Sequence, residues 1–208
     1  GTGKTTLLKI IQGELDPDAG MVRKGPSVKT AYLPQIVQFD EPELTILETV
    51  RRELIIDEGS ARNLLAGFLF TGDDVFKTVE NLSGGERSRL KLCLLMQKGV
   101  NFLILDEPTN HLDINAIEWL EEYLQSYKNA VVIVSHDREF LDKIVTQVYE
   151  IERGIITKYS GNYSAFAIKK RDDWERQQKE YIAQQKEIAR LSGLVERFRY
   201  KATKAAMA

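Results

Sequence analysis

The sequence predicts an α/β domain built around a parallel β-sheet and followed by one long helix. Two continuous apolar runs, residues 102–105 and 130–134, have the pattern of strands that are buried on both faces of such a sheet. Amphipathic helical segments precede and separate these runs. Residues 165–208 contain no proline and carry many charged side chains at helical spacing, which predicts the long helix.

The composition is that of an ordinary soluble globular protein. The chain has 208 residues, a formal net charge of -2, 43% hydrophobic residues and 29% charged residues. No segment approaches the roughly 18 to 20 apolar residues of a membrane span, and no secretory signal opens the chain, so we expect a cytoplasmic protein. Cys93 is the only cysteine, which excludes an intramolecular disulfide, and its leucine neighbours predict a buried structural thiol.

The first six residues match part of a phosphate-binding loop. Gly3-Lys4-Thr5 is the end of the pattern G-x-x-x-x-G-K-[ST], although a chance glycine-rich turn is the alternative for these residues alone. Glycines let backbone N–H groups approach phosphate oxygens, the lysine reaches the outer phosphates, and the threonine hydroxyl can coordinate Mg²⁺. The predicted nucleotide-binding residues are Gly1, Gly3, Lys4, Thr5 and Thr6.

A phosphate-binding loop connects a strand to a helix, and that strand is absent from this sequence. We therefore expect an N-terminally incomplete domain that is poorly stable by itself. After the loop, Leu7, Ile10 and Ile11 repeat on one face of a short helix. Residues 28–34 are β-prone and place Gln35 at a strand end or in the loop just beyond it.

A small helical insert is predicted next, with a helix start after it. Residues 45–56 and 60–70 are amphipathic segments separated by Gly59. In the run Leu82-Ser83-Gly84-Gly85-Glu86 the serine has the N-cap position of a helix, and the glutamate completes a capping box.

Glycines at a helix start expose N–H donors, so this run predicts a second anion site, distinct from the first loop. Its residues are Ser83, Gly84, Gly85 and Glu86. Two such helix starts in one domain predict a composite site, in which each domain covers a nucleotide that another domain holds. The alternative is a well-capped helix without a ligand.

Polar residues follow both buried runs. Asp106 and Glu107 come after the first run and His136 after the second, and the carboxyl ends of parallel strands form a binding edge. Asp106 can hold the Mg²⁺ that bridges the phosphates, and Glu107 can polarise a water for attack on the γ-phosphate. Taken alone, the acidic pair is equally well explained as a strand end that turns at Pro108. The buried face of the next helix is predicted to contain Ile114, Ile117, Leu120 and Leu124.

In this order the motifs resemble those of the ABC ATPase family, over residues 1–163. The resemblance implies an α/β P-loop NTPase fold, with ATP and Mg²⁺ as cofactors. It assigns Gln35 to contact with the metal and the γ-phosphate, Asp113 to a loop at the interface with a second cassette, and His136 to the γ-phosphate. The implied catalytic residues are Glu107, His136 and Gln35, and the implied metal ligands are Thr5, Gln35 and Asp106.

Three features resemble the ABC-F branch of that family. Asn110 and His111 stand where transporters more often carry small residues. The run Tyr159-Ser160-Gly161-Asn162-Tyr163-Ser164 resembles the exit from the first ABC-F domain into its interdomain linker. The long charged helix follows directly, although a solvated C-terminal helix is the alternative. We therefore expect an ABC ATPase domain at 1–163 and the first part of a basic helical linker at 164–208.

The resemblance implies a parent protein with two cassettes that hydrolyses ATP and whose linker reaches into the ribosome. Basic residues outnumber acidic ones in the linker segment, which suits a polyanionic partner such as rRNA. A translation factor and an antibiotic-resistance factor both fit, because the linker tip that would distinguish them lies outside this sequence. The candidate RNA contacts are Arg197, Arg199, Lys201 and Lys204, which are interleaved with two aromatic residues.

The leading alternative is the ATP-binding subunit of a membrane ABC transporter, which would share the catalytic residues. The linker does not support this alternative, and neither do Asn110 and His111. A non-hydrolysing scaffold that uses nucleotide only as a clamp is a third hypothesis. Glu107 argues against it, because a clamp needs no base at that position. GTP also stays open as the nucleotide, because the aromatic residue that stacks on the base in this family would lie before Gly1.

Overall fold

The core is a three-stranded parallel sheet. The computed structural model describes the backbone of residues 3–110 and 112–206 and, within these ranges, the side chains as far as residue 195. β1 (Thr30–Leu33), β2 (Phe102–Asp106) and β3 (Ala130–Val134) pair in the order β1-β2-β3. The two apolar runs are therefore neighbouring strands of one sheet.

Burial differs between these two strands. Leu103, Ile104 and Leu105 of the central strand β2 are 0% exposed, which confirms the prediction of a fully buried strand. The same prediction is wrong for β3, because Ala130 is exposed and the rest of the strand is only partly buried. In the described part of the chain β3 is an edge strand. It has a neighbouring strand along one edge only, which leaves it more exposed than the central strand β2.

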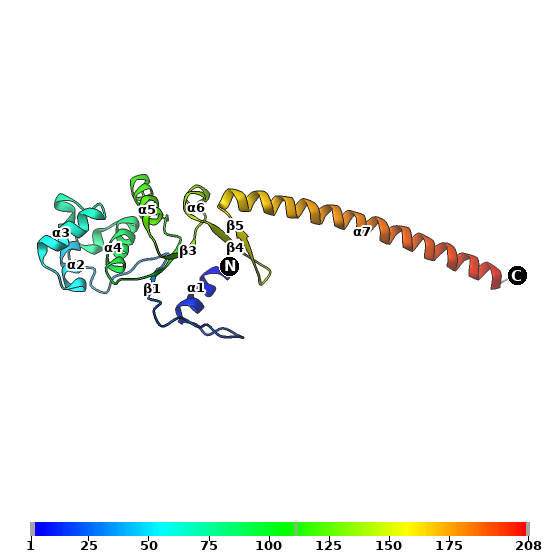
Figure 1. Ribbon diagram of the computed structural model, residues 1–208, viewed down its shortest axis with the longest axis horizontal. Coiled ribbons are helices and arrows are strands. Elements are labelled where there is room, and N and C mark those ends of the chain that lie inside the picture. Colours follow the sequence, from blue (N-terminus) through cyan, green and yellow to red (C-terminus); the bar gives the residue numbers. More distant parts are fainter. Residues whose placement is uncertain (1–2, 111, 207–208) are drawn as a thin grey trace.

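Helices lie on both sides of the sheet (Figure 1). α1 (Lys4–Gln12) is on one side, and α4 (Gly84–Met96) and α5 (Ile114–Ser126) are on the other. The buried residue of α1 is Leu8, whereas the predicted face of Leu7, Ile10 and Ile11 is only partly buried.

Most of the predicted buried face of α5 is confirmed. Leu120 and Leu124 are buried, and Ala116 joins them one turn earlier. Ile114 is 75% exposed, so its prediction is wrong. It is the first residue of the helix and lies outside the stretch of α5 that packs on the core.

The helical insert consists of α2 (Ile46–Leu54) and α3 (Glu58–Gly67), followed by two short 3₁₀ turns. Gly59 does not separate the two helices, as the sequence predicted, because it lies in the first turn of α3. The break is at Ile55, which has a left-handed φ of 55°, and Asp57, whose side chain caps α3. The Asp57 side chain accepts a hydrogen bond from the Ser60 N–H, so the helix can begin here even with Gly59 in its first turn.

Aromatic side chains join the insert to α5. The ring of Phe68, just after α3, lies 5.1 Å from that of Trp119, and Trp119 stacks on Tyr123 at 5.6 Å. The Trp119 indole N–H also donates to the carbonyl of Gly67 at 3.0 Å. Aromatic pairs in this range stabilise a contact beyond their buried area, so the insert is held by α5 as well as by its packing on α4.

A short helix and a hairpin follow β3, and the sequence analysis predicted neither. α6 (Arg138–Ile144) leads into β4 (Gln147–Glu152) and β5 (Ile155–Ser160), which are antiparallel. In the sequence, the signal for the hairpin was the dipeptide Arg153-Gly154. In the structure, these two residues have φ values of 50° and 78°. A two-residue loop with two positive φ angles matches the twist of paired strands.

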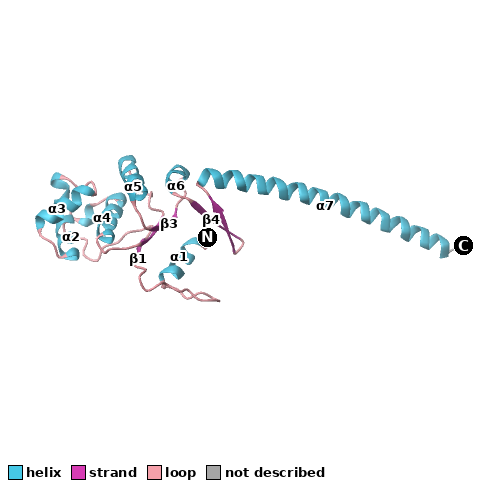
Figure 2. Ribbon diagram, viewed as in Figure 1, coloured by secondary structure: helices cyan, strands magenta, loops and turns pink. Residues whose placement is uncertain are grey.

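The chain continues into α7 (Tyr163–Ala206), a helix of 44 residues that extends away from all other elements (Figures 1 and 2). This confirms the predicted long helix. Its first turn is held by the Ser164 N–H, which donates to Asp142 of α6 at 2.6 Å, and by the Ala165 N–H, which donates to Asn162 at 3.1 Å. Among the described helices, α7 included, none is both long enough and apolar enough to cross a membrane.

We predict that Cys93 does not react with iodoacetamide at pH 8 while the protein is folded. Its side chain is 0% exposed, and burial raises the pKa of its thiol to about 12, so almost no thiolate forms. Mass spectrometry of the peptide that contains Cys93 should show alkylation at least about 100-fold slower in the native protein than in denaturant. Rapid labelling of the native protein would show that the core around α4 opens readily.

Candidate functional site

Predicted site residues from four separate segments gather at the carboxyl edge of the sheet. β1 leads into Gln35, β2 ends at Asp106 and continues into Glu107, and β3 leads toward His136. The start of α1 meets the same edge through Thr5. Ligands of parallel α/β sheets bind at this edge, so the strand pairing has placed these residues where a ligand site is expected.

The start of α1 presents free backbone donors. Gly3 precedes the helix with a left-handed φ of 80°, and among the described residues no side chain caps the helix. The N–H groups of Lys4, Thr5 and Thr6 therefore have no partner within the helix, and the positive end of the helix dipole lies beside them. This arrangement suits phosphate oxygens. Gly1, also a predicted contact, lies outside the described residues.

Two hydroxyl groups converge on Asp106. The Thr5 hydroxyl donates to Oδ2 of Asp106 at 3.4 Å, and the Tyr32 hydroxyl donates to the same oxygen at 3.3 Å. Asp106 is 4% exposed. Burial, and then the charge of Asp106, raises the pKa of Tyr32 to about 12, so its hydroxyl keeps its proton at neutral pH. Tyr32 was not predicted as a site residue, since a tyrosine within a strand matches no nucleotide-binding motif.

These oxygens fit a magnesium ion. Carboxylate and hydroxyl oxygens are its preferred protein ligands, and an ion bound through phosphates needs only one or two of them. The described residues contain no cluster of three or more His, Cys, Asp or Glu side chains that could hold a metal. Of the predicted ligands, Thr5 and Asp106 are in contact. Gln35 follows β1 with an exposed side chain, and in the described part of the chain it makes no hydrogen bond to either.

Glu107 and His136 contact each other. The backbone N–H of His136 donates to Oε2 of Glu107 at 3.2 Å, and Nε2 of its ring lies 3.4 Å from Oε1. Glu107 is only 9% exposed and has a left-handed φ of 52°, held by a hydrogen bond of 2.7 Å from its N–H to the carbonyl of Val134. A non-glycine residue in this region is strained, and such residues cluster at active sites. The imidazole is 83% exposed and can contact a ligand.

The loop after Glu107 is fixed to the segment that carries His136. The Asn110 N–H donates to the carbonyl of Glu107 at 3.1 Å, and the hydroxyls of Thr109 and Ser135 lie 3.3 Å apart. His111 lies outside the described residues. These contacts hold the turn that carries Glu107 against the segment that carries His136.

Asp113, predicted at an interface with a second cassette, is the N-cap of α5. Its Oδ1 accepts a hydrogen bond of 2.8 Å from the Ala116 N–H, and its side chain is exposed. The residue therefore has a structural role within this chain, and its exposure leaves it accessible to a partner.

The predicted second anion site begins α4 with a complete capping box. The Glu86 N–H donates to the Ser83 hydroxyl at 3.2 Å, and the Ser83 N–H donates to the Glu86 carboxylate at 2.8 Å. Burial opposes ionisation of Glu86, but the hydrogen bonds from Ser83 and the charge of Lys77 outweigh it and lower the pKa of that carboxyl. Because Ser83 and Glu86 satisfy each other, the N–H groups without a partner at this helix start are those of Gly84 and Gly85.

The two helix starts lie in different parts of the fold. α4 packs against β1, α2 and α3, whereas α1 lies on the other side of the sheet (Figure 1). The sheet therefore lies between the two helices. This separation agrees with the predicted composite site.

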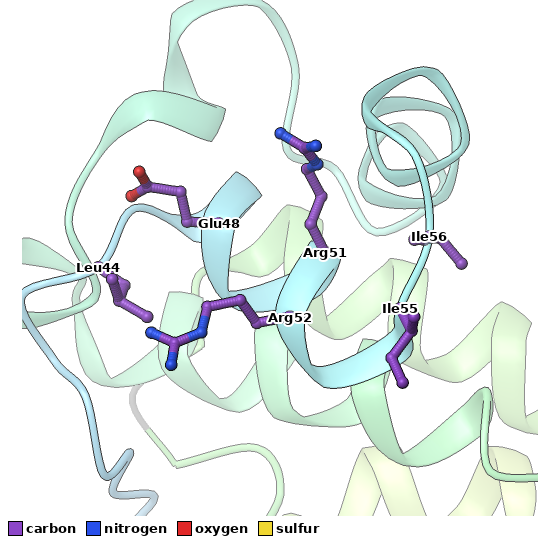
Figure 3. Close-up of a pocket in the computed structure, with 6 residues that line it drawn as sticks. All are labelled: Leu44, Glu48, Arg51, Arg52, Ile55 and Ile56. Atoms are coloured by element: carbon purple, nitrogen blue, oxygen red, sulfur yellow. The ribbon is translucent and has the colours of Figure 1, made fainter.

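Two surface depressions lie away from the carboxyl edge. One, of about 570 Å³, is lined by Leu44, Glu48, Arg51, Arg52, Ile55 and Ile56 of the helical insert (Figure 3). The other, of about 520 Å³, includes Thr30, Phe102 and Ala130, the first residues of the three strands. Neither contains a predicted phosphate-binding or metal-binding residue.

Comparison with known proteins identifies the family. A family described as "ABC transporter" matches residues 1–110, and a second family with the same description matches residues 149–208. YdiF of Bacillus subtilis strain 168, described as an ATP-binding protein, is 39% identical over 241 aligned positions that cover 95% of this chain. The ATP-binding protein Uup of Escherichia coli strain K12 is 40% identical over 190 positions that cover 88% of it. The chain belongs to the ABC-F ATPases.

This ABC-F chain spans only part of these relatives, 37% of YdiF and 28% of Uup. Its fold is that of solved ABC cassettes. The ATP-binding subunit of an ABC transporter superimposes with a TM-score of 0.64 at 22% identity, over 76% of this chain and 74% of the other. A dimeric cassette bound to ADP and phosphate gives a TM-score of 0.59 at 19% identity, over 76% and 81%.

We predict that the two roles of Asp113 can be separated by substitution. Asp113→Ala removes the N-cap of α5 and should lower the free energy of unfolding by about 1 kcal/mol, whereas Asp113→Asn keeps the cap. If Asp113 also acts at a cassette interface, the Asn variant should unfold like wild type in a denaturant titration but hydrolyse ATP more slowly. Wild-type turnover by the Asn variant would leave Asp113 with the capping role alone.

Proposed function

We propose that this cassette binds ATP with Mg²⁺ and hydrolyses it as part of a two-cassette protein that acts on the ribosome, as a translation factor or an antibiotic-resistance factor in the cytoplasm. The observation that carries the catalytic part is the convergence of two contacts at one sheet edge. Thr5 meets Asp106 there, and Glu107 meets His136. The sequence placed the two members of each pair in different motifs, and the fold brings them within hydrogen-bonding distance.

The free N–H groups after Gly3 and the Lys4 ammonium hold the phosphates of the nucleotide. Thr5, Gln35 and Asp106 would hold Mg²⁺, which neutralises charge on the phosphates when it is bound. Substrate and these residues thus share the carboxyl edge of the sheet.

Glu107 is the general base for the attacking water. The water oxygen forms a bond to the γ-phosphorus while the bond from that phosphorus to the bridging oxygen of ADP breaks, and the Glu107 carboxylate accepts the water proton. The His136 N–H fixes the carboxylate, and the exposed imidazole can donate to the γ-phosphate. The products are ADP and inorganic phosphate.

A second cassette completes the site. The N–H groups of Gly84 and Gly85, together with the Ser83 hydroxyl once it turns from its cap, contact the nucleotide held by that second cassette, and Asp113 lies at the interface. Closure over ATP then requires both cassettes. The positions of α1 and α4 on opposite sides of the sheet support this proposal.

The path from the nucleotide to the linker is short. α6 starts directly after His136, with Asp137 as its N-cap. One turn later Asp142 accepts the hydrogen bond from Ser164 at the start of α7, and Arg138 lies over the ring of Tyr163 at 6.0 Å. A shift of His136 toward the γ-phosphate would therefore move the root of α7 as well.

The ribosome is proposed as the partner because of the far end of α7. Arg197, Arg199, Lys201 and Lys204 lie on this helix, although their side chains are outside the described residues. One solved structure of similar fold is an archaeal ribosome recycling factor in complex with a ribosomal stalk protein. It is 25% identical with a TM-score of 0.58, over 73% of this chain and 30% of the other.

We predict that Glu107→Gln in the full-length protein keeps ATP binding but lowers turnover at least about 100-fold, because the amide cannot accept the water proton. Steady-state phosphate release and ATP affinity measure the two effects. Lys4→Ala is the contrasting variant, since it removes charge that binds the phosphates and should weaken ATP affinity itself. Unchanged phosphate release by the Gln variant would exclude Glu107 as the base.

We predict that replacing Arg197, Arg199, Lys201 and Lys204 by alanine in the Glu107→Gln protein weakens co-sedimentation with ribosomes in ATP. Each lost phosphate contact should also flatten the salt dependence of binding, since fewer counterions are released. In an otherwise wild-type background, basal ATP hydrolysis should persist.

The matched control removes the same charge nearer the root of α7, by alanine at Arg171, Arg176, Lys179 and Lys186, all of which are exposed. It should bind ribosomes more tightly than the first variant. Equal weakening by both would show that net charge matters and not contact at the far end. No ribosome binding by the parent Glu107→Gln protein would contradict the ribosome as the partner.

A further inference from the structure

We propose that Tyr32 is a positioning residue of the ATP site, whose hydroxyl holds the Asp106 carboxylate in the orientation that binds Mg²⁺. The proposal rests on the proposed function, which it extends by one residue that no motif includes. It follows from the strand register, from the hydrogen bonds at Asp106 and from the burial of that carboxylate.

The strand register places Tyr32 and Asp106 on one face of the sheet. Tyr32 of β1 pairs with Ile104 of β2. Side chains alternate between faces along a strand, so Ile104 and Asp106 point to the same face, and Tyr32 points there too. Asp106 is thus the diagonal neighbour of Tyr32, a separation that a long aromatic side chain can span.

The face is the one that α1 occupies. Leu103 and Leu105 belong to the hydrophobic core with residues of α4 and α5, so Ile104 and Asp106 point the other way. Thr5, near the start of α1, reaches Asp106 from that side. Tyr32 therefore lies beside the phosphate-binding end of α1 as well as beside the carboxylate.

The two hydroxyls on Oδ2 of Asp106 have different roles. Thr5 is itself a proposed metal ligand, so its hydroxyl oxygen is needed for the ion. The Tyr32 hydroxyl, at 3.3 Å from Oδ2, is then the donor that orients the carboxylate. Asp106 is 4% exposed, so water has little access to replace that donor. A hydrogen bond to a charged group is stronger than one between neutral groups, which makes this contact worth about a tenfold change in an equilibrium.

Tyr32→Phe in the full-length protein tests the proposal, because it removes the hydroxyl and keeps the partly buried ring. Binding of a fluorescent ATP analogue is measured while Mg²⁺ is titrated, together with the thermal unfolding midpoint. The Mg²⁺ concentration for half-maximal binding should rise about 3- to 10-fold, whereas binding without Mg²⁺ should stay as in wild type and the unfolding midpoint should fall by no more than the few degrees that one hydrogen bond contributes. The matched control is Tyr149→Phe, whose hydroxyl bonds to Gln147 in the hairpin, and it should show no change.

An unchanged Mg²⁺ requirement in Tyr32→Phe would overturn the proposal. Equal weakening of binding with and without Mg²⁺, or an unfolding midpoint lowered by more than about 10 °C, would also overturn it, since either result indicates a packing role. The proposed function is judged separately. A wild-type protein that binds the analogue but releases no phosphate would contradict ATP hydrolysis, while the binding titration still decides the role of Tyr32.

Discussion

The pairing of β2 with a strand on each side is the constraint on which the rest of the structure depends. The hydrogen bonds to β1 and β3 fix which residues stand next to Asp106, and the bond from the Glu107 N–H to Val134 continues this ladder beyond the strand. Glu107 then turns with a positive φ, which brings its carboxylate to His136. Two carboxylates from adjacent positions thereby face different partners, Asp106 toward α1 and Glu107 toward the end of β3.

The helical insert reaches this core through packing and not through the sheet. Phe68 and Trp119 join it to α5, the helix that Asp113 caps, while α4 carries the second helix start among the insert helices. Any movement of the insert relative to the sheet must therefore disturb its packing on α4 and on the aromatic rings of α5. Interiors packed in this way shift between discrete arrangements more readily than they deform, which suits a domain that closes on a ligand.

α7 depends on its root for direction, because along most of its length its side chains are exposed and contact nothing else in the described chain. The root is fixed by α6 and by the hairpin, where Lys170 pairs with Glu150 and the ring of Phe166 lies 5.0 Å from that of Tyr159. A rigid helix of this length converts a small rotation at its root into a large displacement at its far end. The root contacts α6, the helix that begins two residues after His136, and under the proposed function this contact links the nucleotide edge to α7.

The sequence by itself determined the fold class and the long helix, and it supplied most of the candidate site residues. Glycine and serine at helix starts and carboxylates after buried strands are local patterns, and their chemistry follows from residue type and spacing. The hairpin after α6 was missed although Arg153-Gly154 signals it, and β3 was predicted to be buried on both faces because an apolar run does not show whether a strand lies at the edge of a sheet. Only the tertiary structure decided which side chains meet. The contact between Tyr32 and Asp106 joins residues 74 positions apart, and only strand register can set a contact over such a distance.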